Sequence, residues 1–430
     1  MQLKQLIVQK LFGKYNHTVT FPIRGEENLD PSVVLICGDN GIGKTRLLRM
    51  LNGLLDLDFS AFREVPFKSV KLTFSNGRTI SVTPTRRKYN NKSINCIRVK
   101  YGTHIVDLNP TQPGALLDEE SNKIKGFRRT FSADTEDISF QYISTSRLQQ
   151  LYSEFETREQ ELRKRKRLAE VYDNEAIYTE QKYHSRRSSD VLLSDRISKF
   201  IRDAQLNYRR FFSSRNSDLF PKIIESLSEK SNRNYNAKDL IARMESVDSL
   251  DNISEHYGLF REPWDIKTLR AILSRKGDNA PDEHALTVAN TYVEFLESRS
   301  AERSLLVERL ETFEKVVNGF LRDKTISVNM RSGIRIEANH GGKIPEVKLS
   351  SGEYHLLFLL VTVVTTQRRG TVIAIDEPEI SMHLKWQRQL MPAILKCASM
   401  AQPQVIIATH SPDITADYAK ECIHLGDDAE

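Results

Sequence analysis

Long apolar runs are missing from this sequence of 430 residues. Its stretch LLFLLVTVV at 356–364 has the length of a core element and falls short of the roughly 18 to 20 residues that a membrane-spanning helix needs. The mean hydropathy of −0.46 is typical of a globular chain rather than a membrane protein. We therefore expect no membrane-spanning segment and no membrane partner.

Cysteine is scarce and poorly spaced for a structural role. The sequence contains four cysteines, Cys37, Cys96, Cys397 and Cys422, and no CxxC pair. Zinc sites and disulfide scaffolds usually show close, regular cysteine spacings. The N-terminus also lacks the charged, apolar and small-residue regions of a secretion signal. These absences predict a reducing cytoplasm, no disulfide and no zinc site.

The positive charge is concentrated in the middle of the chain. The net charge is +6, and between residues 158 and 215 there are 15 Lys or Arg against 9 Asp or Glu, a difference of 6. A basic helical segment is a candidate surface for nucleic acid or a protein partner. Long helices with a charged, solvated face explain the same pattern. Both interpretations remain open from the sequence.

The local patterns change twice along the chain. The first 150 residues contain short β-branched runs separated by turns, and Asn76-Gly77 between alternating runs predicts a hairpin. Helical spacing dominates from 147 to 325. After a further pair of strands the chain alternates between helix and strand, as in TVIAID and QVIIATH. We predict an α/β fold whose two ends share one sheet, with a helical insertion between them.

A complete phosphate-loop motif follows the apolar run SVVLIC. The motif G-x-x-x-x-G-K-[ST] is formed by Gly38, Asp39, Asn40, Gly41, Ile42, Gly43, Lys44 and Thr45. Backbone N–H groups of such a loop surround a β-phosphate, and the following helix N-terminus adds partial positive charge. Lys44 is predicted to neutralise the β and γ phosphates, and Thr45 to coordinate Mg²⁺. A glycine-rich turn that binds nothing is disfavoured by the complete match between strand and helix.

Two further apolar runs end in chemically active residues. TVIAIDEPE at 371–379 presents Asp376 as a Mg²⁺ carboxylate, direct or in the second shell, and Glu377 as the group that polarises the attacking water. Paired acids also occur simply because they favour a helix N-terminus. QVIIATHSPDI ends in His410, which we predict to reach the γ-phosphate or the catalytic water from the same sheet edge.

A small polar turn precedes the apolar helix predicted from about residue 351. Ser350, Ser351 and Gly352 offer hydroxyl and backbone donors at a helix N-terminus, which suits an anion. Ser350 or Ser351 with Glu353 also fits an ordinary capping box.

With these four elements in this order, the sequence resembles the ABC-class ATPases, in the group that includes SMC, Rad50, RecF and the OLD-like ATPases. LSSGE looks like the signature motif of that group, with Ser351 in place of a glycine. The resemblance implies a head-to-head homodimer, or higher homo-oligomer, around ATP and Mg²⁺. Each composite site would combine residues of two chains: Lys44, Thr45, Asp376, Glu377 and His410 from one, and Ser350 and Gly352 from the other. EISMHLKWQ looks like the D-loop region, which implies that Ser381 and His383 lie near the dimer seam.

The resemblance also implies the organisation of the chain. An ABC-type P-loop ATPase head would comprise residues 1–146, with the phosphate loop, and 326–430, with the signature, the acidic strand end and His410. Residues 147–325 would form a short helical arm or lid. The glutamine loop stays unassigned among Gln141, Gln149 and Arg147. Phe12 and Tyr15 are candidates for stacking on adenine.

The sequence looks most like stand-alone OLD-like ATPase subunits of bacterial anti-phage systems, such as Septu, retron-associated Septu-like modules and PARIS. That resemblance rests on LFGKY, GDNGIGKT and IDEPEISMHLKWQ. It implies a slow ATPase that senses infection and controls a separate nuclease or toxin subunit, since we expect no nuclease domain in this chain. A RecF-like repair ATPase and a scaffold that hydrolyses little ATP are the alternatives.

Overall fold

The computed structural model describes residues 1–23, 32–89, 92–108, 118–135, 138–144, 193–213, 219–228, 235–259, 266–366, 370–398 and 402–426. The chain divides into two compact units. The α/β unit comprises Met1–Arg167 and Ser350–Glu430, and the helical unit comprises Leu168–Leu349. Residues 326–349 therefore belong with the helices, whereas the sequence placed them in the C-terminal lobe. The reason is packing, because the strands in this stretch contact the arm helices α5 (Leu193–Ser213) and α9 (Glu283–Phe320).

A five-stranded parallel sheet forms the centre of the α/β unit. Its strands, in spatial order, are β13 (Cys422–His424), β3 (Ser32–Cys37), β12 (Gln404–Ala408), β11 (Val372–Asp376) and β8 (Phe140–Ser144). All residues of β3, β11 and β12 are buried, as expected for parallel strands that are covered on both faces. The prediction that the two ends of the chain share one sheet is confirmed.

A second, antiparallel sheet belongs to the same unit. Its strands, in spatial order, are β2 (Tyr15–Thr20), β1 (Leu3–Leu11), β4 (Ser69–Phe74), β5 (Thr79–Tyr89), β6 (Lys92–Tyr101) and β7 (His104–Leu108). The predicted hairpin at Asn76-Gly77 joins β4 to β5, and the Gly77 N–H donates to the Phe74 carbonyl at 3.0 Å. One apolar core unites this sheet, the inner strands of the parallel sheet and helix α1 (Lys44–Leu55).

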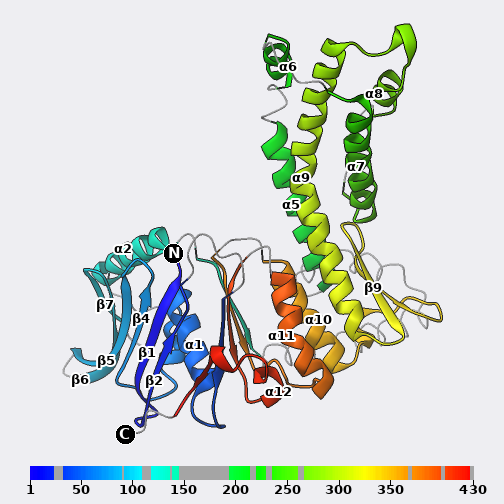
Figure 1. The fold of residues 1–430 in the computed structure, drawn as a ribbon. Helices are drawn as coiled ribbons and strands as arrows, with labels where there is room; N and C mark the ends of the chain where they lie inside the picture. Colours follow the sequence, from blue (N-terminus) through cyan, green and yellow to red (C-terminus); the bar gives the residue numbers. More distant parts are fainter. Residues whose placement is uncertain are drawn as a thin grey trace, which may run out of the picture. The chain divides into compact units, whose positions relative to one another are not determined.

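Helices cover both sheets (Figure 1). The helices of the α/β unit are α1 (Lys44–Leu55), α2 (Asp118–Asp134), α10 (Ser351–Val364), α11 (Leu384–Ala398) and α12 (Pro412–Thr415), with the short 3₁₀ turns η1 (Phe59–Phe62) and η7 (Ala419–Glu421). Sequence patterns did not reveal α2 within the strand-rich first 150 residues. It is held by tertiary contacts, because Phe127 and Phe131 pack their rings against Tyr101 of β6.

A disulfide joins Cys37 to Cys422, so the expectation of no disulfide was wrong. The two cysteines are 385 residues apart in sequence, with Cα atoms 6.2 Å apart. Parallel pairing of β13 with β3 brings them together, and spacing along the chain could not have shown it. Cys37 ends β3 immediately before the phosphate loop, and its carbonyl accepts a hydrogen bond from the Leu425 N–H at 2.8 Å.

The helical unit is built around one long helix. Its elements are α5 (Leu193–Ser213), α6 (Leu219–Ser228), α7 (Ala237–His256), α8 (Ile266–Leu273), η5 (Gly277–Asn279), α9 (Glu283–Phe320), β9 (Lys324–Asn329), β10 (Gly333–Ala338) and η6 (Glu346–Lys348). Helix α9 begins at an Asp282 cap, whose side chain accepts from the Ala285 N–H at 2.8 Å, and packs against α5, α6, α7 and β9 (Figure 1). The helical spacing and the pair of strands read from the sequence are confirmed.

Most of the basic stretch between residues 158 and 215 lies outside the described residues. Within the part of the chain that is described, no helix is long and apolar enough to span a membrane.

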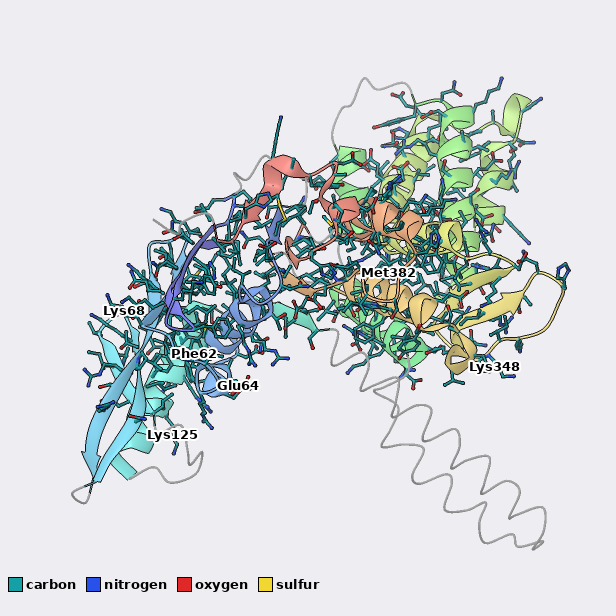
Figure 2. The ribbon with its side chains drawn as sticks, turned by 90° about the horizontal axis from the view of Figure 1, so that it is seen from below. Phe62, Glu64, Lys68, Lys125, Lys348 and Met382 are labelled. Carbon is teal, nitrogen blue, oxygen red and sulfur yellow. A yellow bond between two sulfur atoms is a disulfide. The ribbon has the colours of Figure 1, made fainter. Side chains whose placement is uncertain are left out.

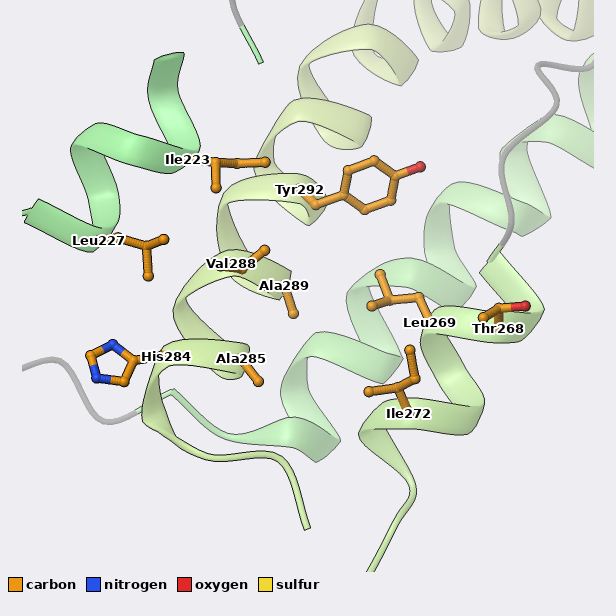
Figure 3. A pocket seen from close by; sticks show the side chains of 10 residues that line it. All are labelled: Ile223, Leu227, Thr268, Leu269, Ile272, His284, Ala285, Val288, Ala289 and Tyr292. Atoms are coloured by element: carbon orange, nitrogen blue, oxygen red, sulfur yellow. The ribbon is translucent and has the colours of Figure 1, made fainter. Parts of the chain in front are cut away.

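An apolar groove of about 540 Å³ lies between α6, α8 and α9 (Figure 3). It is lined by Ile223, Leu227, Thr268, Leu269, Ile272, His284, Ala285, Val288, Ala289 and Tyr292. No lysine or arginine is among these described lining residues, so the groove does not suit a triphosphate.

Candidate nucleotide-binding site

Parallel pairing gathers three groups of predicted site residues, the phosphate loop, Asp376-Glu377 and His410, at one edge of the central sheet, whereas Ser350 and Gly352 lie at the start of α10. In register, Asp376 of β11 lies beside Ala408 of β12, and Ala408 lies beside Ile36 of β3. The phosphate loop, Asp376-Glu377 and Thr409-His410 follow the carboxyl ends of these three strands. In open α/β sheets, ligands bind outside this edge.

The phosphate loop is shaped by close packing. Gly43 caps α1 with a φ of 108°, and a Cβ there would collide with the Leu11 side chain. The Ile42 carbonyl lies 3.1 Å from Nε2 of the buried His17, which must donate because a carbonyl only accepts. The loop is therefore held against β1 and β2 as well as against its own helix.

Lys44 folds its ammonium back into the phosphate loop. Its Nζ donates to the Gly38 carbonyl at 2.6 Å and to the Asp39 carbonyl at 3.0 Å, and the residue is buried. The charge is thus held inside the loop rather than extended into solvent. On the outer side of α1, Arg46 pairs with Glu64, which lies beside this helix (Figure 2).

Thr45 and Asp376, 331 residues apart in sequence, are in direct contact. The Thr45 hydroxyl donates to Asp376 Oδ1 at 3.1 Å, and the Tyr142 hydroxyl donates to Oδ2 at 3.3 Å. Burial, assisted by the charge of Glu377, raises the pKa of Asp376 to about 6 against these hydrogen bonds. Burial and the nearby Asp376 charge raise the pKa of Tyr142 as well, so its hydroxyl stays a donor.

Glu377 has a left-handed backbone with φ of 50°, which is uncommon for a residue other than glycine. Its N–H donates to the Ala408 carbonyl at 2.8 Å, so it continues the strand pairing by one residue before the chain turns. His410 lies at the neighbouring strand end with 47% of its side chain exposed. Its Nδ1 lies 3.0 Å from Oε1 of Glu379, whose side chain is only 4% exposed.

The turn at Ser350 forms the capping box. Its side chain accepts from the Glu353 N–H at 3.3 Å, while the Ser350 N–H donates to Glu353 at 2.8 Å. Gly352 has a steric reason to be glycine, because a Cβ there would collide with the Ser381 carbonyl oxygen. His355 Nδ1 donates to the Ile380 carbonyl at 2.8 Å, and burial lowers the pKa of this histidine. The signature-like helix is thus packed on the turn that follows β11.

Of the three glutamine-loop candidates, Gln141 lies away from the site edge. It pairs in register with Ile373, three residues before Asp376, and Thr366 donates to its side chain at 3.4 Å. Gln149 and Arg147 lie outside the described residues. Of the two aromatic candidates, Phe12 lies close to the loop, with its ring near the Cβ position of Gly43. Tyr15 instead stacks on His17.

A family model for the AAA ATPase domain matches residues 1–415. The chain belongs to this family. No curated protein matches it.

Solved structures of SMC head domains are similar to this AAA ATPase chain. One is an SMC head bound to the C-terminal winged-helix domain of ScpA, at 11% identity over 97% of this chain and 92% of that chain, with a TM-score of 0.37. A second has an extended coiled coil and is bound to the C-terminal domain of ScpA from Pyrococcus furiosus, at 12% identity, 97% and 91% coverage and a TM-score of 0.38. The SMC head from Thermotoga maritima has 11% identity, 97% and 92% coverage and a TM-score of 0.32. The low TM-scores indicate only a distant likeness.

The residues at the sheet edge fit a nucleotide with Mg²⁺. A hydroxyl and a carboxylate in contact, Thr45 and Asp376, are the hard oxygen ligands that Mg²⁺ takes together with phosphate oxygens and water. The buried Lys44 supplies the counter-charge for the phosphates. Family membership and this donor set agree.

Sequence reasoning missed three supporting residues. His17 holds the phosphate loop, Tyr142 holds Asp376, and Glu379 holds His410. The first two come from strands distant in sequence and carry no local signal. Glu379 stands two residues after Glu377, the predicted water-polarising acid. This third acid of the stretch DEPE at 376–379 was therefore a local signal that the sequence did offer.

Proposed function

We propose that this chain is an ATP-hydrolysing sensor and scaffold subunit, which dimerises head to head around ATP and controls a separate nuclease or toxin in anti-phage defence. The observation that carries the ATPase part is the contact between Thr45 and Asp376 at the carboxyl edge of the parallel sheet. That contact joins the end of the phosphate loop to the acidic strand end, where the family's chemistry requires them.

Each residue at the edge would have a distinct task. Lys44 and the loop N–H groups would bind and orient the phosphates, while Thr45 and Asp376 would hold Mg²⁺. When bound, Mg²⁺ neutralises charge that develops on the phosphate oxygens. Glu377 would polarise the attacking water, and His410 would hydrogen-bond to the γ-phosphate or to that water.

The dimer proposal rests on the exposed turn at the start of α10. Ser350 is exposed and lies at the N-terminus of a 14-residue helix, where partial positive charge favours an anion. The capping box uses the oxygen of Ser350 as an acceptor and leaves the hydroxyl proton able to donate. A second copy's γ-phosphate would take that position, and Ser350 with Gly352 would complete the partner's site.

Control of an effector is supported by the resemblance of the phosphate-loop and DEPE segments to defence ATPases. ATP-driven closing and opening of the dimer would change the surface offered to the effector. A repair ATPase would instead bind DNA through its basic arm.

The proposal is tested with purified chain, ATP and Mg²⁺. We expect slow phosphate release and an ATP-dependent doubling of mass in light scattering. Glu377→Gln should lower kcat by about 100- to 10,000-fold and trap the ATP-bound dimer, because water is no longer polarised while binding is kept. Glu421→Gln, at an exposed position of the same unit, is the matched control and should behave as wild type.

The alternatives predict different results. Tight ATP binding without phosphate release, unchanged in Glu377→Gln, would identify a passive scaffold. Salt-sensitive binding to DNA, without co-purification of the product of a neighbouring gene, would favour the repair ATPase.

A further inference from the structure

We propose that Glu379 is a positioning residue for His410, which fixes the proton of the imidazole on Nδ1 and leaves Nε2 to meet the γ-phosphate or the catalytic water. This inference rests on the proposed ATP hydrolysis and adds a residue to its machinery. It starts from the 3.0 Å separation between Glu379 Oε1 and His410 Nδ1.

The turn after β11 carries Glu379 to the end of the neighbouring strand. The Glu377 N–H pairs with the Ala408 carbonyl, and the left-handed conformation of Glu377 bends the chain directly after this pairing. The Ile380 N–H then donates back to the Glu377 carbonyl at 3.3 Å, which closes a tight turn. Glu379 therefore projects from one strand end toward Thr409 and His410 at the next.

The contacts of the Glu379 carboxylate define its position. Oε1 accepts from the Thr409 hydroxyl at 2.8 Å and from the His410 backbone N–H at 2.8 Å, besides facing Nδ1. Because these two donors fix Oε1, the oxygen cannot swing away from the imidazole. A buried carboxylate requires such donors, and a histidine that supplies one is held in orientation by it.

The direction of the hydrogen bond decides the tautomer. A carboxylate oxygen only accepts, so His410 Nδ1 must carry a proton. In the neutral ring, Nε2 is then an acceptor, and in the charged ring it is a second donor. In either form Nε2 points away from Glu379. The His410 side chain is about half exposed, whereas the Glu379 side chain is buried.

The backbone around His410 has anchors that do not depend on Glu379. The Ser411 hydroxyl donates to Gln387 at 2.6 Å, and the Thr409 N–H donates to the Ile36 carbonyl at 3.1 Å. The Gln387 amide in turn donates to the Met382 carbonyl at 2.9 Å. Loss of the Glu379 carboxylate should therefore disturb the orientation of the His410 imidazole more than the backbone at residues 409–411.

Steady-state kinetics with Mg²⁺ and ATP form the first test. Glu379→Leu should lower kcat by about 10- to 100-fold, as when the hydrogen-bond partner that orients a metal-bound histidine is removed, and leave KM for ATP within about twofold. Glu379→Gln keeps an acceptor for all three donors and should recover part of the loss. Gln387→Ala, which removes an anchor of the loop but not of the ring, is the matched control and should stay near wild type.

A double variant separates positioning from general packing. If Glu379 acts through His410, Glu379→Leu combined with His410→Ala should be no slower than His410→Ala alone. Additive losses, or an equal loss in Gln387→Ala, would overturn the proposal.

An NMR measurement tests the contact without hydrolysis. In protein with ¹⁵N-labelled histidine, the His410 resonance, assigned by its loss in His410→Ala, should show a protonated Nδ1 that becomes mixed in Glu379→Leu. An unprotonated Nδ1 in the wild type would refute the inference. If wild-type protein fails to hydrolyse ATP but shows the protonated Nδ1, the proposed function fails while the positioning contact stands.

Discussion

The two units of this protein bury polar groups in opposite ways. In the helical unit, Arg303 and Asp251 pair at 2.7 Å with side chains only 7% and 2% exposed. Glu314 is likewise shared between the Tyr257 hydroxyl and the Val328 N–H. The partners of these groups all belong to the helical unit, on α7 and the residue after it, α9 and β9.

In the α/β unit, buried polar groups end in exposed ones. The buried Asp376 accepts a hydrogen bond from the partly buried Thr45, and the buried Glu379 contacts the half-exposed His410. All of these groups stand at one sheet edge, where parallel strands end together. Burial alone therefore does not mark a functional site. The informative feature is a buried carboxylate whose partner reaches solvent.

The largest effect is expected from breaking the buried Arg303–Asp251 ion pair of the helical unit. Arg303→Met should lower the free energy of unfolding by about 3 to 5 kcal/mol, because Asp251 is left charged and buried. Restoring an apolar partner with Asp251→Leu in the same chain should recover much of the loss. Urea unfolding followed by circular dichroism measures both.

Its control is an exposed ion pair of the same unit. Arg270 pairs with Glu245 at 2.8 Å, with both side chains more than half exposed. Arg270→Met should cost no more than about 1 kcal/mol. Equal losses of unfolding free energy at the two sites would show that the buried ion pair matters no more than the exposed one.

Lys44→Ala tests the polar groups at the sheet edge of the α/β unit. Loss of a charged donor should weaken binding of ATP with Mg²⁺ by about 1.5 to 3 kcal/mol, measured by calorimetry. Lys68→Ala, at an exposed position of the same unit (Figure 2), should leave affinity unchanged. Unaltered affinity in Lys44→Ala would mean that the phosphates bind elsewhere.

Gly352→Ala tests the packing of the signature-like helix on the turn after β11. The added methyl would meet the Ser381 carbonyl, so we expect a loss of about 1 to 3 kcal/mol in thermal unfolding. Gly126, within α2, has open space at its Cβ position, and Gly126→Ala should be neutral or stabilising by up to about 1 kcal/mol. A stable Gly352→Ala variant would leave anion binding as the main reason for this glycine.

The smallest effect is a pH slope from Glu346, which accepts hydrogen bonds from the N–H groups of Leu193 and Ser194 at the start of α5. Burial raises its pKa above the ordinary value of 4.5. Folding therefore favours the protonated form, and stability present below pH 4.5 is lost as pH rises through the raised pKa.

Glu346→Gln should remove that slope, worth about 1.4 kcal/mol for each unit by which the pKa is raised. The measurement is the difference in unfolding free energy between variant and wild type from about pH 4.5 to 7.5. Glu337→Gln, about half exposed, is the control. A difference that does not change with pH would show that Glu346 is not perturbed.

Local patterns predicted much of this protein. The phosphate loop, the three apolar strands and the Asn76-Gly77 hairpin each depend on a few adjacent residues whose preferences agree, so they were readable. Helix α2 was missed because its support comes from rings on distant strands. The boundary of the helical unit was misplaced because a hairpin packs on helices that precede it in the chain.

The short stretches GDNGIGKT and DEPE are enough to predict a phosphate-binding loop and acidic ligands, because each motif depends only on a few adjacent residues. Tertiary structure alone decided which of those residues meet. The order β13-β3-β12-β11-β8 places Thr45 on Asp376, Glu379 on His410 and Cys37 on Cys422. Strand order results from packing across the whole core, so no local pattern encodes it.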